Sequence, residues 1–541
     1  MKKISLFVLL LVVLSLNPIY SQYVNVRITP ASSPVYGEEY IMINPKNTDQ
    51  VVVGSIGNYY PQNTAMGYFY STNGGLNWSG GPLLTTLAQP GSDPIVVVDT
   101  NGNFYYVTCA NWLMPPPPWL DKLLCLRSTN GGMNWNNGTA FAQLYPKMDD
   151  MPMACVDFSH SSYGNNIYVT WTLYDHYTSS NPNDSSYVYF CRSTDGGITF
   201  STPLRVSKIA GSASGNNSSP EGPEPCTGPN GEVYVCFPHN EQIFFNRSTN
   251  AGVTWLENDI IVSQQIGGWA QYNFSPVSDC DISNSPYNGN IYICFADQKN
   301  GVNDRDIWVT KSTNGGFNWN TPVRVNNDPP GNDQRLPWIC VDRVTGFVWV
   351  VFYDTRGHTS TQADVYVARS TDGGSTFQNI KVSEQTTTTV NWLGDYIGIS
   401  AYNNKVRPVW SRSISTYYCE LWTAIIDTFI IGIEPISTNI PDKFSLRQNY
   451  PNPFNPSTKI KFDIPDSPFM KESRGMGVRL SIYDLLGREV AILLDEQLKP
   501  GTYEVEWDGS NYTSGIYFYK LMASGVEPGD FNKTKRMVLL K

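Results

Sequence analysis

The sequence has few charged residues and few histidines. Asp, Glu, Lys and Arg make up 16% of its 541 residues, against about 25% in an average domain, and there are 4 His. The 47 acidic residues outnumber the 37 basic ones, and no Lys and Arg cluster is long enough to follow a phosphate backbone. Nucleic acid is therefore not an expected partner.

Long apolar runs are missing beyond the N-terminus. The run over residues 4–16 follows Lys2 and Lys3 and precedes the small residue Ser21. It is shorter than the roughly 20 residues that a helix needs to cross a bilayer, so it predicts a signal peptide over residues 1–22. We expect an exported mature chain without a transmembrane segment.

The ten cysteines include no C-x-x-C motif, which gives little support to a metal site. Two interpretations stay open. In an exported chain the cysteines form disulfides, with Cys226–Cys236, Cys280–Cys294 and Cys109–Cys125 as candidate pairs. Alternatively, they act as small buried hydrophobic residues.

Glycine (44), proline (37) and aromatic residues (13%) are abundant, which favours an all-β fold with many turns. One eight-residue pattern, exemplified by residues 71–78 (STNGGLNW), occurs six times at intervals of 55 to 65 residues. The copies begin at Ser71, Ser128, Ser193, Ser248, Ser312 and Ser370. A period of this size leaves room for one four-stranded sheet per repeat, which is typical of a β-propeller.

Each repeat predicts a hairpin that closes on an aromatic ring. The Asn or Asp at the third position can accept hydrogen bonds from turn amides, and glycine supplies the unusual backbone angles. Seven pairs of short strands precede the repeats or follow the last one, and a further strand over residues 23–28 is placed to complete the last sheet. We predict seven blades, with a six-bladed sialidase-like ring as the alternative.

The repeat resembles the Asp-box, or bacterial neuraminidase repeat, of the sialidase superfamily, with Asp only at Asp195 and Asp372 and Asn in the other copies. The resemblance implies a propeller whose boxes lie opposite the active site. It also implies a tyrosine nucleophile assisted by Glu, an aspartate acid/base and three arginines that hold a sugar carboxylate. Arg27, in Arg27-Ile-Thr-Pro30, resembles the family's first arginine motif with one residue inserted.

Polar residues at two sets of loops are expected to surround the channel on the ligand face. The candidate catalytic residues are Asp175, Asp297, Asp354, Tyr353 and Glu221, and the candidate substrate-binding residues are Arg27, Arg335, Arg356 and Trp112. The loops that lead into each blade add Asp93, Asp149, Asp150, Glu224 and Asp395. Acidic residues outnumber basic ones here, which is unfavourable for an anionic sugar.

The sequence changes character near Phe444. Asn449-Tyr-Pro-Asn-Pro and later runs such as 478–484 and 514–520 alternate between apolar and polar residues, which predicts a small β-sandwich. These motifs resemble the type A C-terminal sorting domain of the type IX secretion system, which implies passage through the outer membrane. We predict four segments: signal peptide 1–22, propeller 23–428, linker 429–443 and sorting domain 444–541.

No cofactor is expected, and calcium is the one ion that the acidic run Asn303-Asp304-Arg305-Asp306 admits, although it lacks EF-hand spacing. The sequence favours a secreted or cell-surface propeller that binds or processes extracellular glycans. Two alternatives stay open: an active exo-sialidase or other glycoside hydrolase, and a non-catalytic protein-interaction propeller. The expected partners are glycans or glycoproteins and the type IX secretion machinery.

Overall fold

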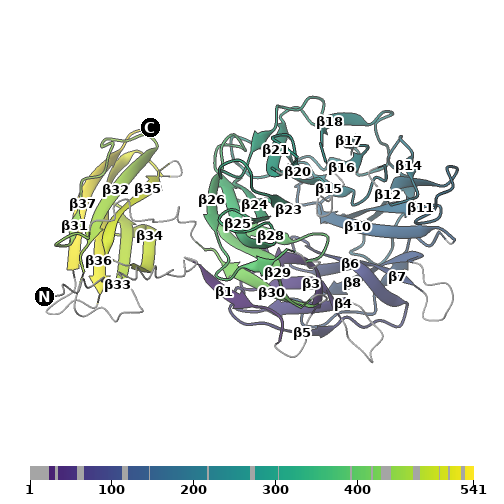
Figure 1. Ribbon diagram of the computed structural model, residues 1–541, viewed down its shortest axis with the longest axis horizontal. Helices are drawn as coiled ribbons and strands as arrows, with labels where there is room; N and C mark the ends of the chain where they lie inside the picture. The colour runs from purple at the N-terminus through teal and green to yellow at the C-terminus, as the bar shows by residue number, and fades with distance from the viewer. Residues whose placement is uncertain are drawn as a thin grey trace, which may run out of the picture.

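The computed structural model describes residues 23–30, 35–57, 66–111, 120–144, 146–215, 218–267, 275–302, 304–389, 393–415, 418–427, 440–466, 476–498, 500–509, 512–524 and 531–541. All regular secondary structure within these ranges is β-strand, as the sequence predicted. Strands β1–β30 form a ring of sheets and strands β31–β37 form a separate pair of sheets (Figure 1).

The ring repeats one order of strands, from an inner strand to an outer edge. The inner strands are β2 (Val35–Ile43), β6 (Gln89–Val98), β10 (Met148–Val156), β15 (Glu224–Thr227), β19 (Val277–Cys280), β23 (Gln334–Val341) and β28 (Gly398–Tyr402). Each pairs antiparallel with the next strand in sequence: β3 (Val51–Gly57), β7 (Phe104–Asn111), β11 (Ile167–Tyr174), β16 (Val233–His239), β20 (Ile291–Asp297), β24 (Val348–Asp354) and β29 (Lys405–Ser415).

The third strands lead into the eight-residue repeats, except in the last group, where the third strand is the last strand of the ring in the sequence. They are β4 (Met66–Ser71), β8 (Lys122–Ser128), β12 (Ser185–Ser193), β17 (Gln242–Ser248), β21 (Asp306–Ser312), β25 (Gln362–Ser370) and β30 (Tyr418–Ile425). The outer strands are β5 (Ser79–Pro82), β9 (Thr139–Phe141), β13 (Leu204–Arg205), β18 (Ile260–Gln264), β22 (Val323–Arg324), β26 (Gln378–Lys381) and β1 (Val24–Arg27); β14 (Gly211–Ser212) and β27 (Thr387–Thr388) add short edges.

The ring closes on itself. Each inner strand contacts the next around the circle, and β28 contacts β2. Strand β1 pairs antiparallel with β30, so the first strand of the chain supplies the outer strand of the last sheet, as expected. Because β2 and β30 also share the bridge Val35↔Cys419, the first and last groups form one eight-stranded sheet. Seven blades stays a prediction that rests on dividing this sheet between β30 and β2.

The middle strands of each sheet are buried on both faces, which explains their continuous apolar sequences. All seven residues of β24 are buried, and Val348, Val350 and Phe352 have no exposed surface. Strands covered on both sides read as unbroken runs of β-branched and aromatic residues rather than as alternating patterns. The repeat therefore packs its sheets into one continuous apolar core.

The turn of each repeat is held by its own side chains. In the first copy, the Asn73 carboxamide oxygen accepts a hydrogen bond from the Asn77 amide at 2.9 Å, and Ser71 Oγ accepts one from the Gly75 amide at 2.8 Å. The Trp78 indole donates to the Gly75 carbonyl at 2.8 Å. Asn can replace Asp at the third position because the turn requires an acceptor oxygen.

Basic residues just before several repeats connect neighbouring sheets. Arg192 donates to the Ala251 carbonyl at 2.7 Å, and Arg247 donates to the Gly315 carbonyl at 2.6 Å. Both carbonyls belong to the turn of the next repeat, and the Arg247 guanidinium also lies 3.8 Å from the centre of the Phe317 ring. These arginines therefore fasten each hairpin to the following one.

The disulfide interpretation is wrong in this structure, because all ten cysteines are free. In the β15–β16 pair, Cys226 lies opposite Tyr234 and Cys236 lies opposite Glu224. Similarly, Cys280 lies opposite Ile291 and Cys294 opposite Val277, while Cys109 and Cys125 lie opposite Leu123 and Val107. The register separates each expected pair, and most of the thiols pack in the core as small hydrophobic groups.

Strands β31–β37 form a two-sheet sandwich with its own core. One sheet contains β31 (Ser445–Leu446), β32 (Ser457–Ile464) and β35 (Gly501–Asp508); the other contains β34 (Glu489–Leu498), β33 (Met476–Tyr483), β36 (Gly515–Ser524) and β37 (Phe531–Leu539). Phe462, Leu480 and Tyr519 are fully buried between the sheets. Among the described residues of the whole chain, no helix has the length and apolarity that a membrane crossing needs.

Candidate functional site

A backbone distortion recurs at the start of the inner strands. The pairing register shifts between Gly37 and Tyr40, Ser92 and Ile95, Asp150 and Met153, and Arg335 and Trp338. At each shift one non-glycine residue has a left-handed φ: Glu38 (55°), Asp93 (54°), Met151 (46°) and Leu336 (49°). Such residues cost roughly 1–3 kcal/mol each and re-aim the side chains around them.

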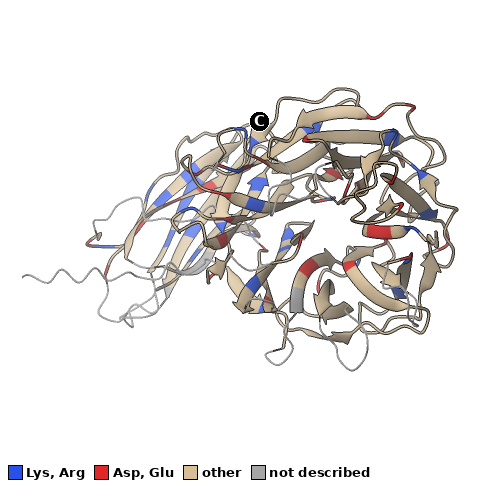
Figure 2. Cartoon of the chain, turned by 45° about the vertical axis from the view of Figure 1, so that its right-hand side comes forward, with Lys and Arg blue, Asp and Glu red and all other residues tan. Residues whose placement is uncertain are grey.

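The distortion gathers acidic side chains at one end of the central channel. Glu38 and Asp93 occupy the bulges of β2 and β6, Asp150 precedes the bulge of β10, Glu221 precedes β15, and Asp395 precedes β28. We call these five residues the mouth carboxylates. The first four are at least nine-tenths buried. Figure 2 shows acidic segments, in red, on strands around the middle of the ring.

Few hydrogen bonds offset the burial of these carboxylates. Glu38 accepts a hydrogen bond from the Asp93 amide at 3.2 Å, and Ser92 Oγ donates to the Asp93 carboxylate. The Tyr174 hydroxyl, at the end of β11, donates to Glu221 Oε1 at 2.7 Å, with both side chains buried. This pair joins a phenol to a carboxyl group at the channel mouth.

Burial and repulsion between neighbouring carboxylates raise the pKa values of Glu38, Asp93, Asp150 and Glu221. Burial, with added repulsion from Asp395, raises the pKa of Asp93 to about 6. Burial also raises the pKa of Glu221 to about 7 against the lowering effect of the Tyr174 hydrogen bond, and Asp395 and Asp93 add to the rise. The pKa values of Glu38 and Asp150 are raised well above the usual range for the same reasons. Carboxyls with pKa values near neutrality can exchange protons with a substrate at physiological pH.

Two connected cavities run along the channel. The upper cavity, of about 350 Å³, is lined by Glu224, Asp395, Trp338, Tyr396 and residues of the bulges. The lower cavity, of about 760 Å³ including space open to solvent, is lined by residues of all seven inner strands. Glu224 and Trp338 line both, so they lie where the two cavities meet. Both volumes include space open to solvent.

Of the five candidate catalytic residues, only Glu221 belongs to this cluster. Asp175 forms an ion pair with Lys147 at 2.8 Å, and Asp297 accepts a hydrogen bond from the Ile266 amide at 3.1 Å. Asp354 is buried and receives the Arg356 guanidinium at 2.7 Å. The Tyr353 hydroxyl is engaged by the backbone of Ser411, both as donor and as acceptor, at 2.9 Å. Within the part of the chain that the structure describes, no hydrogen bond or ion pair joins these four to one another.

The candidate substrate-binding arginines are each paired with a nearby acid. Arg27, on β1, forms an ion pair with Glu420 at 2.8 Å, and Arg335 forms one with Asp333 at 2.9 Å. Arg356 is held by Asp354, and its guanidinium lies over the Tyr366 ring. The three arginines therefore serve separate carboxylates, and Trp112 lies outside the described residues.

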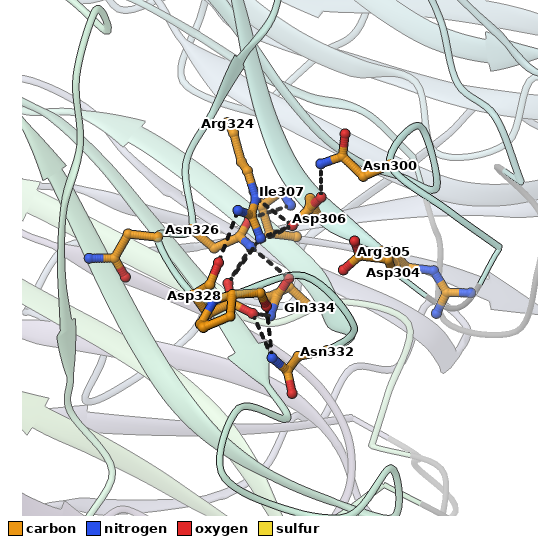
Figure 3. A network of polar contacts seen from close by, with 12 residues as sticks. Asn300, Asp304, Arg305, Asp306, Ile307, Arg324, Asn326, Asp328, Asn332 and Gln334 are labelled. Atoms are coloured by element: carbon orange, nitrogen blue, oxygen red, sulfur yellow. Dashed lines mark hydrogen bonds and ion pairs between the residues drawn. The ribbon is translucent and has the colours of Figure 1, made fainter.

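The acidic run considered for calcium forms a satisfied polar network (Figure 3). Buried Asp306 accepts hydrogen bonds from Arg324 at 2.6 Å and Asn326 at 2.7 Å, and Asp304 accepts one from the Gly331 amide. Asn303 lies outside the described residues. Arginine and amide donors occupy the oxygens that a cation would need. Within the described ranges, no group of three or more His, Cys, Asp or Glu is arranged to hold a metal ion.

The sequence pointed to most of the mouth carboxylates but missed Glu38. A proline follows the left-handed residue in three of the four distorted strands, at Pro94, Pro152 and Pro337, but Glu38 is followed by Glu39. Because a residue before proline avoids the right-handed helical region, these prolines mark the distortion in three strands and give no signal at Glu38.

Comparisons with known proteins separate the two parts of the chain. Residues 448–533 match the family model of the secretion system C-terminal sorting domain. This domain indicates a secreted or cell-surface protein and an interaction with the secretion machinery. No curated protein is similar in sequence to the chain.

Several solved structures are similar to the chain at low identity. An ulvan lyase, described as a new family of polysaccharide lyase, is 12% identical, with 74% of this chain and 96% of that chain covered and a TM-score of 0.47. A Hadza microbial sialidase is 14% identical, with 67% and 73% covered and a TM-score of 0.39. An α-L-arabinanase of Penicillium chrysogenum is 11% identical, with 62% and 94% covered and a TM-score of 0.38. Likeness at this level carries no argument about activity.

Proposed function

We propose that the protein is an extracellular propeller that binds glycans at the channel mouth and processes them by acid–base chemistry. The observation that carries the proposal is the buried Tyr174–Glu221 pair among the mouth carboxylates. A glycosidic bond is cleaved when one carboxyl donates a proton to the leaving oxygen and a second group assists at the sugar carbon. Glu221, with a pKa of about 7, is suited to donate that proton, and Asp93 is a neighbouring carboxylate.

The arginines argue against a sialoside as the substrate. A sugar carboxylate is held most strongly by guanidinium groups in a fork. Arg27, Arg335 and Arg356 are each paired with a different acid of the protein. A neutral or cationic glycan therefore fits the mouth better than an anionic one. The proposal places this site in a propeller over residues 23–428 and assigns export to a sorting domain over residues 444–541.

The proposal is tested by hydrolysis of a panel of fluorogenic glycosides, including a sialoside, by the full-length secreted protein. We expect cleavage of at least one non-sialoside, with activity falling as the pH rises above about 7 because Glu221 then loses its proton. Glu221→Gln should lower kcat by about 100-fold or more. Tyr174→Phe should shift the alkaline limb of the pH–activity profile to higher pH. The Tyr174 hydrogen bond lowers the pKa of Glu221 in the native protein, and the substitution removes it.

Glu257→Gln serves as the matched control, since Glu257 is exposed beyond the Trp255 turn and distant in sequence from the mouth. Equal activity in Glu221→Gln and the native protein would contradict the catalytic part of the proposal. Failure to bind any glycan would contradict it entirely.

A further inference from the structure

The upper cavity has a one-sided charge. Its lining includes Glu224 and Asp395 but no Lys, Arg or His among the described residues. Asp395 lies near Glu38, Asp93, Asp150 and Glu221, since its repulsion adds to burial in raising the pKa of each of the four. None of the principal influences on these four groups is a basic side chain.

Glu224 provides an independent sign of a ligand. It is 5% exposed and lines both cavities, yet its carboxyl makes no hydrogen bond or ion pair with the described residues. Its nearest charged influence is Asp279, which repels it. An unpaired buried polar group costs about 1–3 kcal/mol. A ligand that donates a hydrogen bond to the Glu224 carboxyl would therefore recover this free energy.

Other buried acids of the ring show the contrast. Asp306 is paired with Arg324, Asp354 with Arg356, and Glu39 accepts a hydrogen bond from Ser411 at 2.8 Å. Each of these three carboxylates has a partner within the ring. The Glu224 carboxyl has none among the described residues.

The arrangement suits a cation larger than a metal ion. A divalent metal requires several oxygens at about 2.0–2.6 Å, and no three acidic groups in the described residues are arranged in that way. Trp338 and Tyr396 add aromatic surface beside the carboxylates, their ring centres 5.7 Å apart. Aromatic surface next to polar acceptors suits a sugar ring.

We propose that the upper cavity binds a sugar residue with a free primary ammonium group, a de-N-acetylated amino sugar, whose ammonium lies beside Glu224 and Asp395. This inference rests on the proposed glycan-binding function and names its substrate class. The ammonium supplies the donors that Glu224 lacks, and the apolar face of the ring packs against Trp338.

Binding should depend on pH, because protonated carboxyls attract a cation weakly. The titratable groups that face the cavity or its mouth come from every neighbouring element: Glu38, Asp93, Asp150, Tyr174, Tyr177, Glu221, Glu224, Asp279, Asp395 and Tyr396, with Arg343 in the lower cavity that Glu224 also lines. Affinity should rise by about tenfold or more between roughly pH 5.5 and pH 7.5, because Asp93 and Glu221, with pKa values of about 6 and 7, lose their protons there, and protons are released on binding.

The test is isothermal titration calorimetry on the full-length secreted protein with three probes. These are a glucosamine oligosaccharide, the N-acetylglucosamine oligosaccharide of the same length, and spermidine as an amine without a sugar. We expect the glucosamine oligosaccharide to bind at least about tenfold more tightly than either other probe. Glu224→Gln should remove that preference, while Glu257→Gln should keep it, and thermal unfolding of both variants reports whether they fold.

The outcomes separate the two proposals. Equal affinity for the acetylated and free amino oligosaccharides would overturn the ammonium inference and leave the glycan function standing. Equal affinity for spermidine and the glucosamine oligosaccharide would overturn the assignment to a sugar. If no oligosaccharide of any kind binds, the proposed function itself fails.

Discussion

At the scale of single residues, the buried carboxyls of the channel mouth lower the stability of the fold when they are charged. A carboxyl whose pKa is raised on folding contributes stability that is fully present at low pH and is lost as the pH rises. For Asp93 the loss begins near the ordinary value of about 4 and is complete above the folded-state value of about 6. The charged form of this group is thus tolerated in the native state and favoured in the unfolded state.

Asp93→Asn should remove this loss of stability. Asparagine keeps the shape of the side chain and tolerates the left-handed φ of 54° at this position. We expect the free energy of unfolding to increase by about 2 kcal/mol at pH 7.5 and to change little near pH 4. Urea unfolding at both pH values measures it, and an equal effect at the two would contradict the raised pKa.

The residue scale is also where prediction from sequence was weakest. Glu221 was recognised because it lies in a loop leading into an inner strand, but Asp175, Asp297 and Asp354 were favoured because they end the next strands. The structure engages those three with Lys147, a backbone amide and Arg356. Asp354 finds its partner two residues along the chain, whereas the partners of Asp175 and Asp297 come from segments about 30 residues away. A strand pattern does not contain either contact.

At the scale of elements, the hairpin of each repeat could be predicted, while the bulge of β2 that carries Glu38 could not. The hairpin follows from local chemistry, since Ser71, Asn73 and Gly75 hold one turn through contacts within a few residues. Glu38 and Asp93 adopt a left-handed φ although they are not glycine, so residue type does not predict this conformation. It depends on packing against the adjacent inner strand. Local rules therefore specified the repeat, and tertiary packing specified the site.

The arginines that join neighbouring hairpins give a prediction at this scale. Arg247→Met keeps an apolar stem against Phe317 but removes the hydrogen bond to the Gly315 carbonyl. We expect the free energy of unfolding to fall by about 1.5–3 kcal/mol, the range for a hydrogen bond to a charged group.

Arg205→Met is the control, because Arg205 lies over the Tyr187 ring of its own sheet, 4.6 Å from the ring centre. Chemical denaturation compares the two variants. Equal losses of stability would show that the contact between hairpins has no special role.

At the scale of the whole molecule, export and recognition belong to separate parts of the chain. The match of residues 448–533 to a secretion sorting domain indicates where the protein acts, and the carboxylates that we assign to recognition all lie in the ring. The sandwich has its own buried core around Leu480 and Tyr519. A change in one part should therefore leave the role of the other intact.

Removal of residues 444–541 should abolish delivery to the cell surface and leave the ring folded. The truncated protein is expected to accumulate in the periplasm because it lacks the segment that the secretion machinery recognises. Fractionation followed by immunoblotting measures its location, with Glu221→Gln in the full-length chain as the control that should still be exported. Normal surface delivery of the truncated protein would contradict the sorting assignment.

The most direct test of the account is a crystal structure of the full-length protein with the oligosaccharide that it binds most tightly. The account predicts a sugar residue in the upper cavity, with polar groups of the ligand in contact with Glu224 and Asp395 and a ring against Trp338. An oligosaccharide bound on the face of the repeat turns, with the channel mouth empty, would contradict it.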